Sequence, residues 1–99
     1  MVSYEWAAAK NRENLAKHEI DFADAVLIFD GRVVEAPDRR RDYGEERITA
    51  IGVANGVELF VVYTPRRNNR RIISARRATR RERKNYYQAL GRRRGEGQD

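Results

Sequence analysis

The sequence contains no cysteine, one histidine and no long run of apolar residues. Without cysteine the chain can form neither a disulfide framework nor a thiolate metal site, and it has no thiol nucleophile. A single histidine argues against a zinc site built from protein ligands alone, because such sites use several His or Cys side chains. The longest apolar runs, Ala25–Phe29 and Leu59–Tyr63, are too short to span a bilayer. These absences predict a soluble cytoplasmic protein that uses no cofactor, no metal and no membrane.

Positive charge is abundant in the sequence but unevenly distributed. The 99 residues carry 21 Lys and Arg against 15 Asp and Glu, a net charge of +6. Residues 1–64 hold 8 basic and 12 acidic side chains, a net of −4, whereas residues 65–99 hold 13 basic and 3 acidic, a net of +10. A basic C-terminal third on a mildly acidic body is typical of proteins that bind a polyanion. The length predicts one domain over residues 1–90, followed by a basic flexible tail over residues 91–99.

The apolar pattern predicts an α+β fold, with two N-terminal helices packed on an antiparallel sheet of about four strands and a short C-terminal helix. Asp21 can cap the second helix, and Thr79 with Glu82 matches a capping box at the start of the last helix, which Gly91 is expected to end. Tyr4–Trp6 is expected to be a short extended or turn segment. The expected helices are Ala7–His18, Phe22–Phe29 and Arg80–Leu90, and the expected strands are Val33–Ala36, Arg47–Ala54, Val57–Thr64 and Arg71–Arg77.

The pair Asn55-Gly56 predicts a two-residue hairpin turn in the middle of the chain. Such a turn fixes the register of the two strands that it joins. The predicted pairs are Ala54 with Val57, Gly52 with Leu59, Ile51 with Phe60, Ala50 with Val61, Thr49 with Val62, Ile48 with Tyr63 and Arg47 with Thr64. Both faces carry apolar residues, so the hairpin is expected to lie centrally, with helices over one side.

Ten basic residues fall within residues 66–84. In a regular strand Arg71 and Arg77 would share one face, and Arg76 would take the other. Guanidinium groups bind phosphate through two parallel hydrogen bonds, so arginine suits a phosphodiester better than lysine. A charged run is often only a solvated face. Here the 13 basic residues against 3 acidic ones favour anion binding.

Two short motifs contain groups that could act on a phosphate. Lys17-His18 ends the first predicted helix, where His18 can move a proton near neutral pH and Lys17 can stabilise negative charge. Glu46-Arg47 opens the first hairpin strand, where a carboxylate can act as base towards a ribose 2′-hydroxyl and Arg47 can hold the phosphate. Each motif also has a plainer interpretation, as a helix C-terminal cap and as a surface ion pair respectively.

Tyrosines lie near these basic clusters and could stack on nucleic-acid bases. Tyr43 and Tyr63 are the candidates for that role, whereas Tyr86 and Tyr87 fit half-buried packing better. No glycine-rich phosphate loop and no acidic cluster suited to magnesium is present in the sequence. Any nuclease chemistry is therefore expected to be independent of metal.

A set of short segments occurs in a characteristic order between Tyr4 and Tyr87. They are Tyr4-Glu5-Trp6, Lys10-Asn11, Asn14-Leu15, Lys17-His18, Asp21-Phe22, Asp24-Ala25, Tyr43-Gly44-Glu45-Glu46-Arg47, Ile51-Gly52, Val62-Tyr63-Thr64 and Arg71-Ile72-Ile73-Ser74-Ala75-Arg76. Together they resemble the BrnT family of type II toxins. The sequence departs from the family pattern at Ala7, where the family usually has Asp, and at Glu19, where it usually has Gly.

The resemblance implies a RelE-like fold and a toxin that cleaves RNA and stops translation. It also implies neutralisation by a BrnA-type antitoxin with a DNA-binding part, in a dimer or a heterotetramer formed through the antitoxin. The residues that match the family's polar positions are Lys17, His18, Arg47 and Arg76, with Tyr63 and Glu46 as plausible additions. Arg71, Arg77 and Arg80 are expected to provide further contacts to RNA phosphates.

These residues predict metal-independent cleavage by attack of the 2′-hydroxyl on the adjacent phosphate. Arg47 and Arg76 would hold the phosphate and stabilise the charge that develops, and His18 or Glu46 would move the protons. Two alternatives stay open at this point. One is a module that binds RNA or DNA without cutting it, and the other is a domain whose basic face mainly receives an acidic antitoxin.

Overall fold

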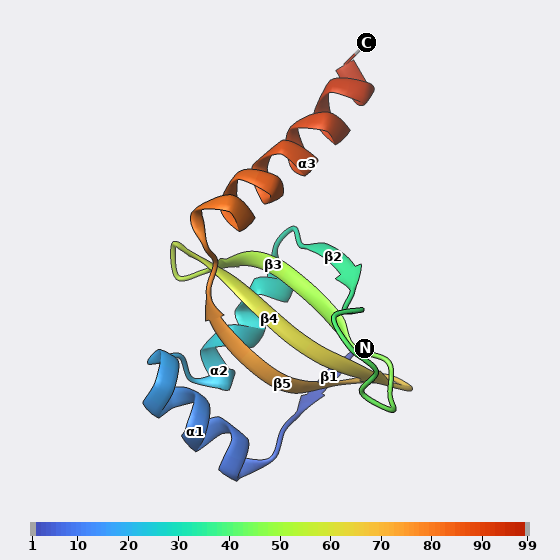
Figure 1. Ribbon diagram of the computed structural model, residues 1–99. Helices are drawn as coiled ribbons and strands as arrows, with labels where there is room; N and C mark the ends of the chain where they lie inside the picture. The colour runs from blue at the N-terminus through green and yellow to red at the C-terminus, as the bar shows by residue number, and fades with distance from the viewer. Residues whose placement is uncertain (1, 99) are drawn as a thin grey trace.

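A computed structural model describes residues 2–98 of the chain, with side chains as far as residue 91 (Figure 1). Within this part, five strands form one mixed sheet in the order β1-β5-β4-β3-β2. The strands are β1 Ser3–Glu5, β2 Val34–Pro37, β3 Ile48–Ala54, β4 Val57–Arg66 and β5 Asn69–Arg77. The helices are α1 Ala8–His18, α2 Phe22–Ala25, the 3-10 helix η1 Val26–Asp30, and α3 Arg80–Gln98. The predicted α+β class is confirmed, and the predicted arrangement differs in detail.

The sheet has one strand more than predicted, because the N-terminal segment joins it. β1 runs parallel to β5, with Ser3 opposite Asn69 and Glu5 opposite Arg71. The prediction of about four antiparallel strands is therefore wrong. Three residues with little apolar alternation give no strand signal of their own, and their partner lies more than 60 positions away in the sequence.

The hairpin prediction is confirmed residue by residue. β3 and β4 pair from Ala54–Val57 through Ile51–Phe60 to Ile48–Tyr63. Asn55 and Gly56 both adopt positive φ angles, 51° and 78°, as the tight turn requires. The predicted Arg47–Thr64 pair falls just outside the ladder, because β3 begins at Ile48.

A bulge in β5 corrects the predicted placement of the arginines. Val62 pairs with Ser74 and Tyr63 pairs with Ile72, so that Ile73 has no partner in the ladder. One extra residue reverses which face the following side chains point to. Arg71 and Arg76 therefore share one face, and Arg77 lies on the other face.

α2 and η1 cover one face of the sheet, behind the strands in Figure 1, whereas α1 lies beside β5 and α3 extends beyond the end of the sheet. The largest fully buried side chains there are Phe22, Ile28, Val61 and Ile72. As predicted, Asp21 caps the second helix, its carboxylate accepting from the Ala23 N–H at 3.0 Å. That helix continues as the tighter η1 after Ala25, rather than as one regular helix to Phe29.

A buried amide, not an apolar stripe, attaches α1 to the sheet. Asn14 is 6% exposed, whereas its apolar neighbour Leu15 is 45% exposed. The Asn14 Nδ2 donates to the Ala75 carbonyl at 2.8 Å, and the Ala75 N–H donates back to the Asn14 Oδ1 at 3.0 Å. α1 therefore lies along β5, where Asn14 pairs with the backbone groups of Ala75 that lie beyond the end of β1.

The capping box at the start of α3 is confirmed. The Glu82 N–H donates to the Thr79 hydroxyl at 3.2 Å, and the Thr79 N–H donates to Glu82 Oε1 at 2.8 Å. The predicted end at Leu90 is wrong, because α3 runs to Gln98. A glycine inside a helix costs only about 1 kcal/mol, and the arginines that follow Gly91 are good helix formers. The predicted basic flexible tail over residues 91–99 stays a prediction, because the side chains from residue 92 onward lie outside the described part.

Candidate active site

The face of the sheet that the helices leave open gathers arginines from β5 and its neighbours. Arg71 pairs with Thr64, and Arg76 pairs with Phe60 on the same face. Arg71 Nη1 lies 2.7 Å from Glu5 Oε2, and Arg76 Nη1 lies 2.8 Å from Glu82 Oε1. These ion pairs hold the pKa of both carboxyl groups below the usual range, with the hydrogen bond from the arginine as the largest cause.

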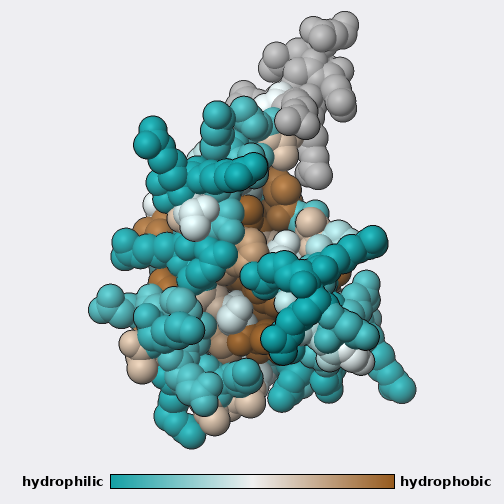
Figure 2. All heavy atoms as spheres, in the orientation of Figure 1, coloured by the Kyte–Doolittle hydropathy of each residue, from teal (hydrophilic) through white to brown (hydrophobic). Residues whose placement is uncertain are grey.

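Between the arginines the open face has an apolar floor. Val62 is 3% exposed, and Ile51 and Phe60 are half-buried. Figure 2 shows this floor as an apolar area bordered on both sides by hydrophilic side chains. An apolar strip between cationic groups can contact the bases of a single strand while the arginines contact its phosphates.

Arg47 lies at one end of this face, just before β3. Its guanidinium carbon is 4.0 Å from the centre of the Tyr43 ring, and its Nε donates to Glu45 Oε2 at 3.4 Å. Glu45 also accepts from the Thr64 hydroxyl at 3.1 Å. Glu46 is exposed beside them. A cleft of about 440 Å³ opens here, lined by Pro37, Asp38, Arg39, Arg41, Asp42, Tyr43, Glu45, Glu46 and Arg47.

A buried carboxylate fixes the loop that carries Arg47. Asp38 accepts two hydrogen bonds from the Arg40 guanidinium, at 2.8 and 2.7 Å, and its own N–H donates to the Arg47 carbonyl at 2.8 Å. The Arg40 hydrogen bonds lower the pKa of Asp38 to about 2. The stretch from Asp38 to Asp42 gave no clear prediction from sequence; in the structure Asp38 closes the loop and presents Arg47 to the cleft.

Lys17 and His18 lie at the end of α1, on the other side of β5. With Lys10, Glu13, Asn14, Ile73 and Ser74 they line a shallow notch of about 180 Å³. His18 is half-buried and Lys17 is exposed. Ser74 belongs to the open face, since it pairs with Val62, so the notch borders that face along the edge of β5.

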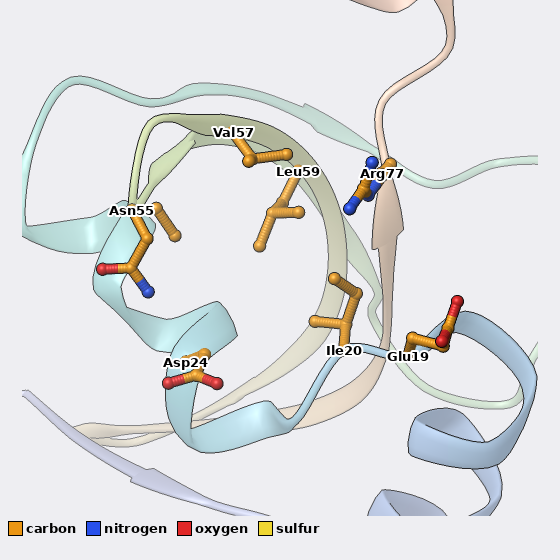
Figure 3. A pocket seen from close by; sticks show the side chains of 8 residues that line it. Glu19, Ile20, Asp24, Asn55, Val57, Leu59 and Arg77 are labelled. Carbon is orange, nitrogen blue, oxygen red and sulfur yellow. The ribbon is translucent and has the colours of Figure 1, made fainter.

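Three of the predicted site residues lie away from the open face. Tyr63 is on the covered face, where its hydroxyl donates to Glu35 at 2.5 Å, and burial raises its pKa to about 12. Arg77 lines a hollow of about 130 Å³ that is separate from the open face. Figure 3 shows this hollow, with Ile20 and Leu59 at its floor and charged side chains at its rim. Arg80 is exposed at the first position of α3.

The structure thus divides the predicted residues into groups rather than bringing them to one point. Arg76 is two strands across and four residues along from Arg47, which places their backbones about 16 Å apart. At that separation the two guanidinium groups suit different parts of one extended polyanion. Glu46 shares the cleft with Arg47, and His18 lies nearer to Ser74 and Arg76.

Several structural residues of the site were missed in the sequence. Asn14 joins α1 to β5, Asp38 closes the Arg47 loop, and the Phe60 ring lies 4.2 Å from the Arg76 guanidinium. Only Phe60 had a usable signal, since the predicted hairpin register places it opposite Ile51 on the face that the helices leave open. In the described part of the chain, no group of three or more His, Asp or Glu side chains is placed to hold a metal ion. Over the same residues, no helix is both long and apolar enough to cross a membrane.

The fold and this face define a small α+β protein with an arginine-bearing sheet surface. A sequence profile described as "Ribonuclease toxin, BrnT, of type II toxin-antitoxin system" matches residues 6–82. The chain therefore belongs to the BrnT family of ribonuclease toxins, and the family resemblance found in the sequence is confirmed.

A solved structure agrees with this assignment. The crystal structure of the Brucella abortus ribonuclease toxin BrnT is similar to this chain with a TM-score of 0.60 and 27% sequence identity. The similarity covers 81% of this chain and 100% of the Brucella protein. No curated protein sequence gives a significant match.

Proposed function

We propose that this chain is a metal-independent endoribonuclease that stops translation by cutting RNA in the cytoplasm. The observation that carries the proposal is the bulge at Ile73, which places Arg71 and Arg76 on one open face together with the Arg47 cleft. A single RNA strand laid across this face would meet Arg47, Arg71 and Arg76 in turn, with the apolar floor between them. Family membership supports ribonuclease activity in general.

The cleft at Arg47 is the best-equipped place for the chemical step. Glu46 takes the proton of the ribose 2′-hydroxyl, whose oxygen attacks the adjacent phosphorus. The bond from phosphorus to the 5′-oxygen then breaks, and Glu46 returns the proton to that leaving oxygen. The products are a 2′,3′-cyclic phosphate and a 5′-hydroxyl. Arg47 stabilises the charge that develops on the phosphate oxygens.

The remaining basic side chains hold the RNA on either side of the cleaved phosphodiester bond. Arg71 and Arg76 contact flanking phosphates or bases on the open face, and Lys17 with His18 extends this surface over the edge of β5. His18 is the alternative proton carrier, because it borders the same face. Tyr63 contributes no atom to this arrangement, since its hydroxyl is bonded to Glu35 on the covered face.

Incubation of the purified protein with single-stranded RNA in excess EDTA tests the proposal. We expect cyclic-phosphate products, and an Arg47→Ala variant with cleavage reduced on the order of 100-fold or more, as for other lost transition-state donors. Arg12→Ala on the exposed side of α1 is the matched control and should cut normally. Salt-dependent binding without products would instead indicate a non-catalytic nucleic-acid-binding module.

The assignment of the proton carrier is tested by a pair of variants. Glu46→Gln should lose most cleavage while it still binds RNA, and His18→Ala should keep it. The reverse result would transfer the role to His18.

We further propose that an acidic surface of a BrnA-type antitoxin covers the open face, and that the antitoxin's DNA-binding part sets the size of the complex, a dimer or a heterotetramer. Co-expression should relieve growth arrest. Mass measurement of the purified complex would give the stoichiometry.

A further inference from the structure

Phe60 and Arg76 form a cation–π pair, the Phe60–Arg76 stack, on the open face close to the end of β5. They are direct cross-strand partners, Phe60 on β4 and Arg76 on β5. The Arg76 guanidinium carbon lies 4.2 Å from the centre of the Phe60 ring, within the range of a cation–π contact. The ring is half-buried and is held from below by the sheet, so that the guanidinium forms the upper layer of the pair.

The Nη1–Nη2 edge of the Arg76 guanidinium is already occupied. Its Nη1 and Nη2 donate to the two carboxylate oxygens of Glu82 at 2.8 and 2.9 Å, and Nη1 also donates to the Arg77 carbonyl at 3.2 Å. A guanidinium in this state cannot offer that edge to a phosphate, so a ligand can meet it only at the Nε side or at its face. The side chain is 31% exposed, so part of it is accessible to a ligand.

Glu82 is itself held in place by the start of α3. The Thr79 N–H donates to Glu82 Oε1, and the Glu82 N–H donates to the Thr79 hydroxyl. The orientation of the guanidinium is therefore set by a capping box rather than by a flexible surface contact. The stack is preorganised before any ligand arrives.

The surroundings select the kind of ligand that would lie on this stack. Half-buried Ile51 continues the apolar floor beside Phe60, and Arg71 and Arg47 lie further along the same face. A ligand that fits must then combine a flat ring with negative charge on the side of Arg71 and Arg47. An unpaired nucleotide within an RNA strand has both, since bases stack on guanidinium planes as they do on aromatic rings.

We propose that the Phe60–Arg76 stack is a nucleobase platform, on which one unpaired base of the RNA lies flat against the guanidinium. The inference rests on the proposed RNA substrate and assigns Arg76 a stacking role in place of a phosphate-holding one. Phe60 acts as a positioning residue through Arg76, and Glu82 sets the orientation of the plane.

Abasic scanning of a single-stranded RNA with uncleavable 2′-O-methyl groups tests the platform. For the wild-type protein, removal of the base at one position should weaken binding about tenfold, while removal elsewhere should have little effect. Phe60→Leu keeps an apolar side chain but removes the ring. This variant should weaken binding of the intact strand about tenfold as well. It should not further weaken binding of the strand that already lacks the base at the sensitive position. The proposal would be overturned if Phe60→Leu also weakened binding of that abasic strand, or if removal of no single base weakened binding by the wild-type protein.

Glu82→Gln separates stacking from phosphate binding. Glutamine can still complete the capping box, so α3 keeps its start, but the charged partner of Arg76 is lost. If Arg76 stacks, this variant weakens binding of the intact strand and leaves binding of the sensitive abasic strand unchanged. If Arg76 is instead a phosphate ligand that Glu82 occupies, the variant binds every strand more tightly, and the platform is overturned.

The two proposals fail in different ways in these measurements. If the wild-type protein cuts RNA but Phe60→Leu binds like wild type, only the platform is wrong. If the protein neither binds nor cuts RNA, the proposed function falls and the platform falls with it. If Phe60→Leu weakens binding of an acidic antitoxin but not of RNA, the stack belongs to a protein interface and the nucleobase assignment is overturned.

Discussion

The covered face and the open face of the same sheet differ in how their side chains are satisfied. On the covered face, apolar side chains such as Ile28 and Val61 are removed from water altogether. On the open face, each described arginine of β5, Arg71 and Arg76, is paired with a carboxylate that another element supplies. Burial of apolar area stabilises a fold strongly, whereas exposed ion pairs contribute little. The comparison predicts that substitutions on the covered face lower the free energy of unfolding, whereas substitutions on the open face weaken ligand binding.

Two neighbouring isoleucines in β5 give the strongest test of this comparison. Ile72 is 1% exposed in the core, and Ile73 occupies the bulge beside the α1 notch. Ile72→Ala should lower the free energy of unfolding by about 2–5 kcal/mol, and Ile73→Ala by about 1 kcal/mol. Urea denaturation measures both, and equal losses would contradict the comparison.

The buried hydroxyl of Tyr63 on the covered face should make stability sensitive to alkali. Burial, with the hydrogen bond to Glu35 as the second cause, raises its pKa to about 12, above the value of about 10 for an unfolded tyrosine. The stabilisation is therefore complete below pH 10 and is lost as the pH rises towards 12. Up to about 2–3 kcal/mol is at stake.

Tyr63→Phe should remove this alkaline loss, measured as the unfolding free energy between pH 8 and pH 11.5. Tyr87→Phe serves as the comparison: the hydrogen bond from its hydroxyl to Glu58 raises the pKa of Tyr87 as well, but Tyr87 is exposed and the variant should change the pH profile much less. Parallel profiles for wild type and Tyr63→Phe would show that Tyr63 is not the responsible group.

Gly52 marks the closest approach of a helix to the covered face. A Cβ at this position would lie 2.8 Å from Ile28 Cβ and 3.3 Å from the Ile28 carbonyl oxygen. Gly52→Ala should therefore destabilise the protein by about 1–3 kcal/mol, seen as a lower thermal midpoint. Gly31→Ala meets nothing within 4 Å and should change little. Tolerance of alanine at both positions would show that η1 can move away from the sheet.

The smallest expected effect lies at the turn between α1 and α2, outside both faces. Glu19 adopts the left-handed conformation at φ 60° and ψ 27°, where the family usually has glycine. Glu19→Gly should stabilise the protein by about 1 kcal/mol. The same change at Glu13, inside α1, should destabilise it by a similar amount. Stabilisation of both or neither, by chemical denaturation, would contradict the assigned strain.

Local signals predicted the parts of this fold that are local in origin. Asn55-Gly56 gave the register of the central hairpin, and Thr79 with Glu82 gave the start of α3, because each depends on residues a few positions apart. β1 and the Asn14–Ala75 contact were missed, since both join segments about 60 positions apart without an apolar pattern. The end of α3 was missed because glycine is tolerated in a helix at a cost of about 1 kcal/mol.

The candidate site was predicted in its composition but not in its geometry. The sequence identified the arginines, yet a regular strand would have put Arg71 and Arg76 on opposite faces. A bulge of one residue, which no local pattern announced, brought them together. The ion pair between Arg76 and Glu82 was also missed, because it joins a strand side chain to the cap of a helix and the capping motif alone does not indicate it.

The buried amide of Asn14 has a consequence for the behaviour of the protein at high concentration. Free backbone groups at the edge of a sheet invite other chains to add strands. Here the β5 side is closed by three residues of β1 and then by Asn14, which uses both polar groups of Ala75. The opposite edge, β2, is only four residues long, carries Glu35 and ends at Pro37, which has no N–H to donate. Both edges are thus protected against edge-to-edge association, by different means.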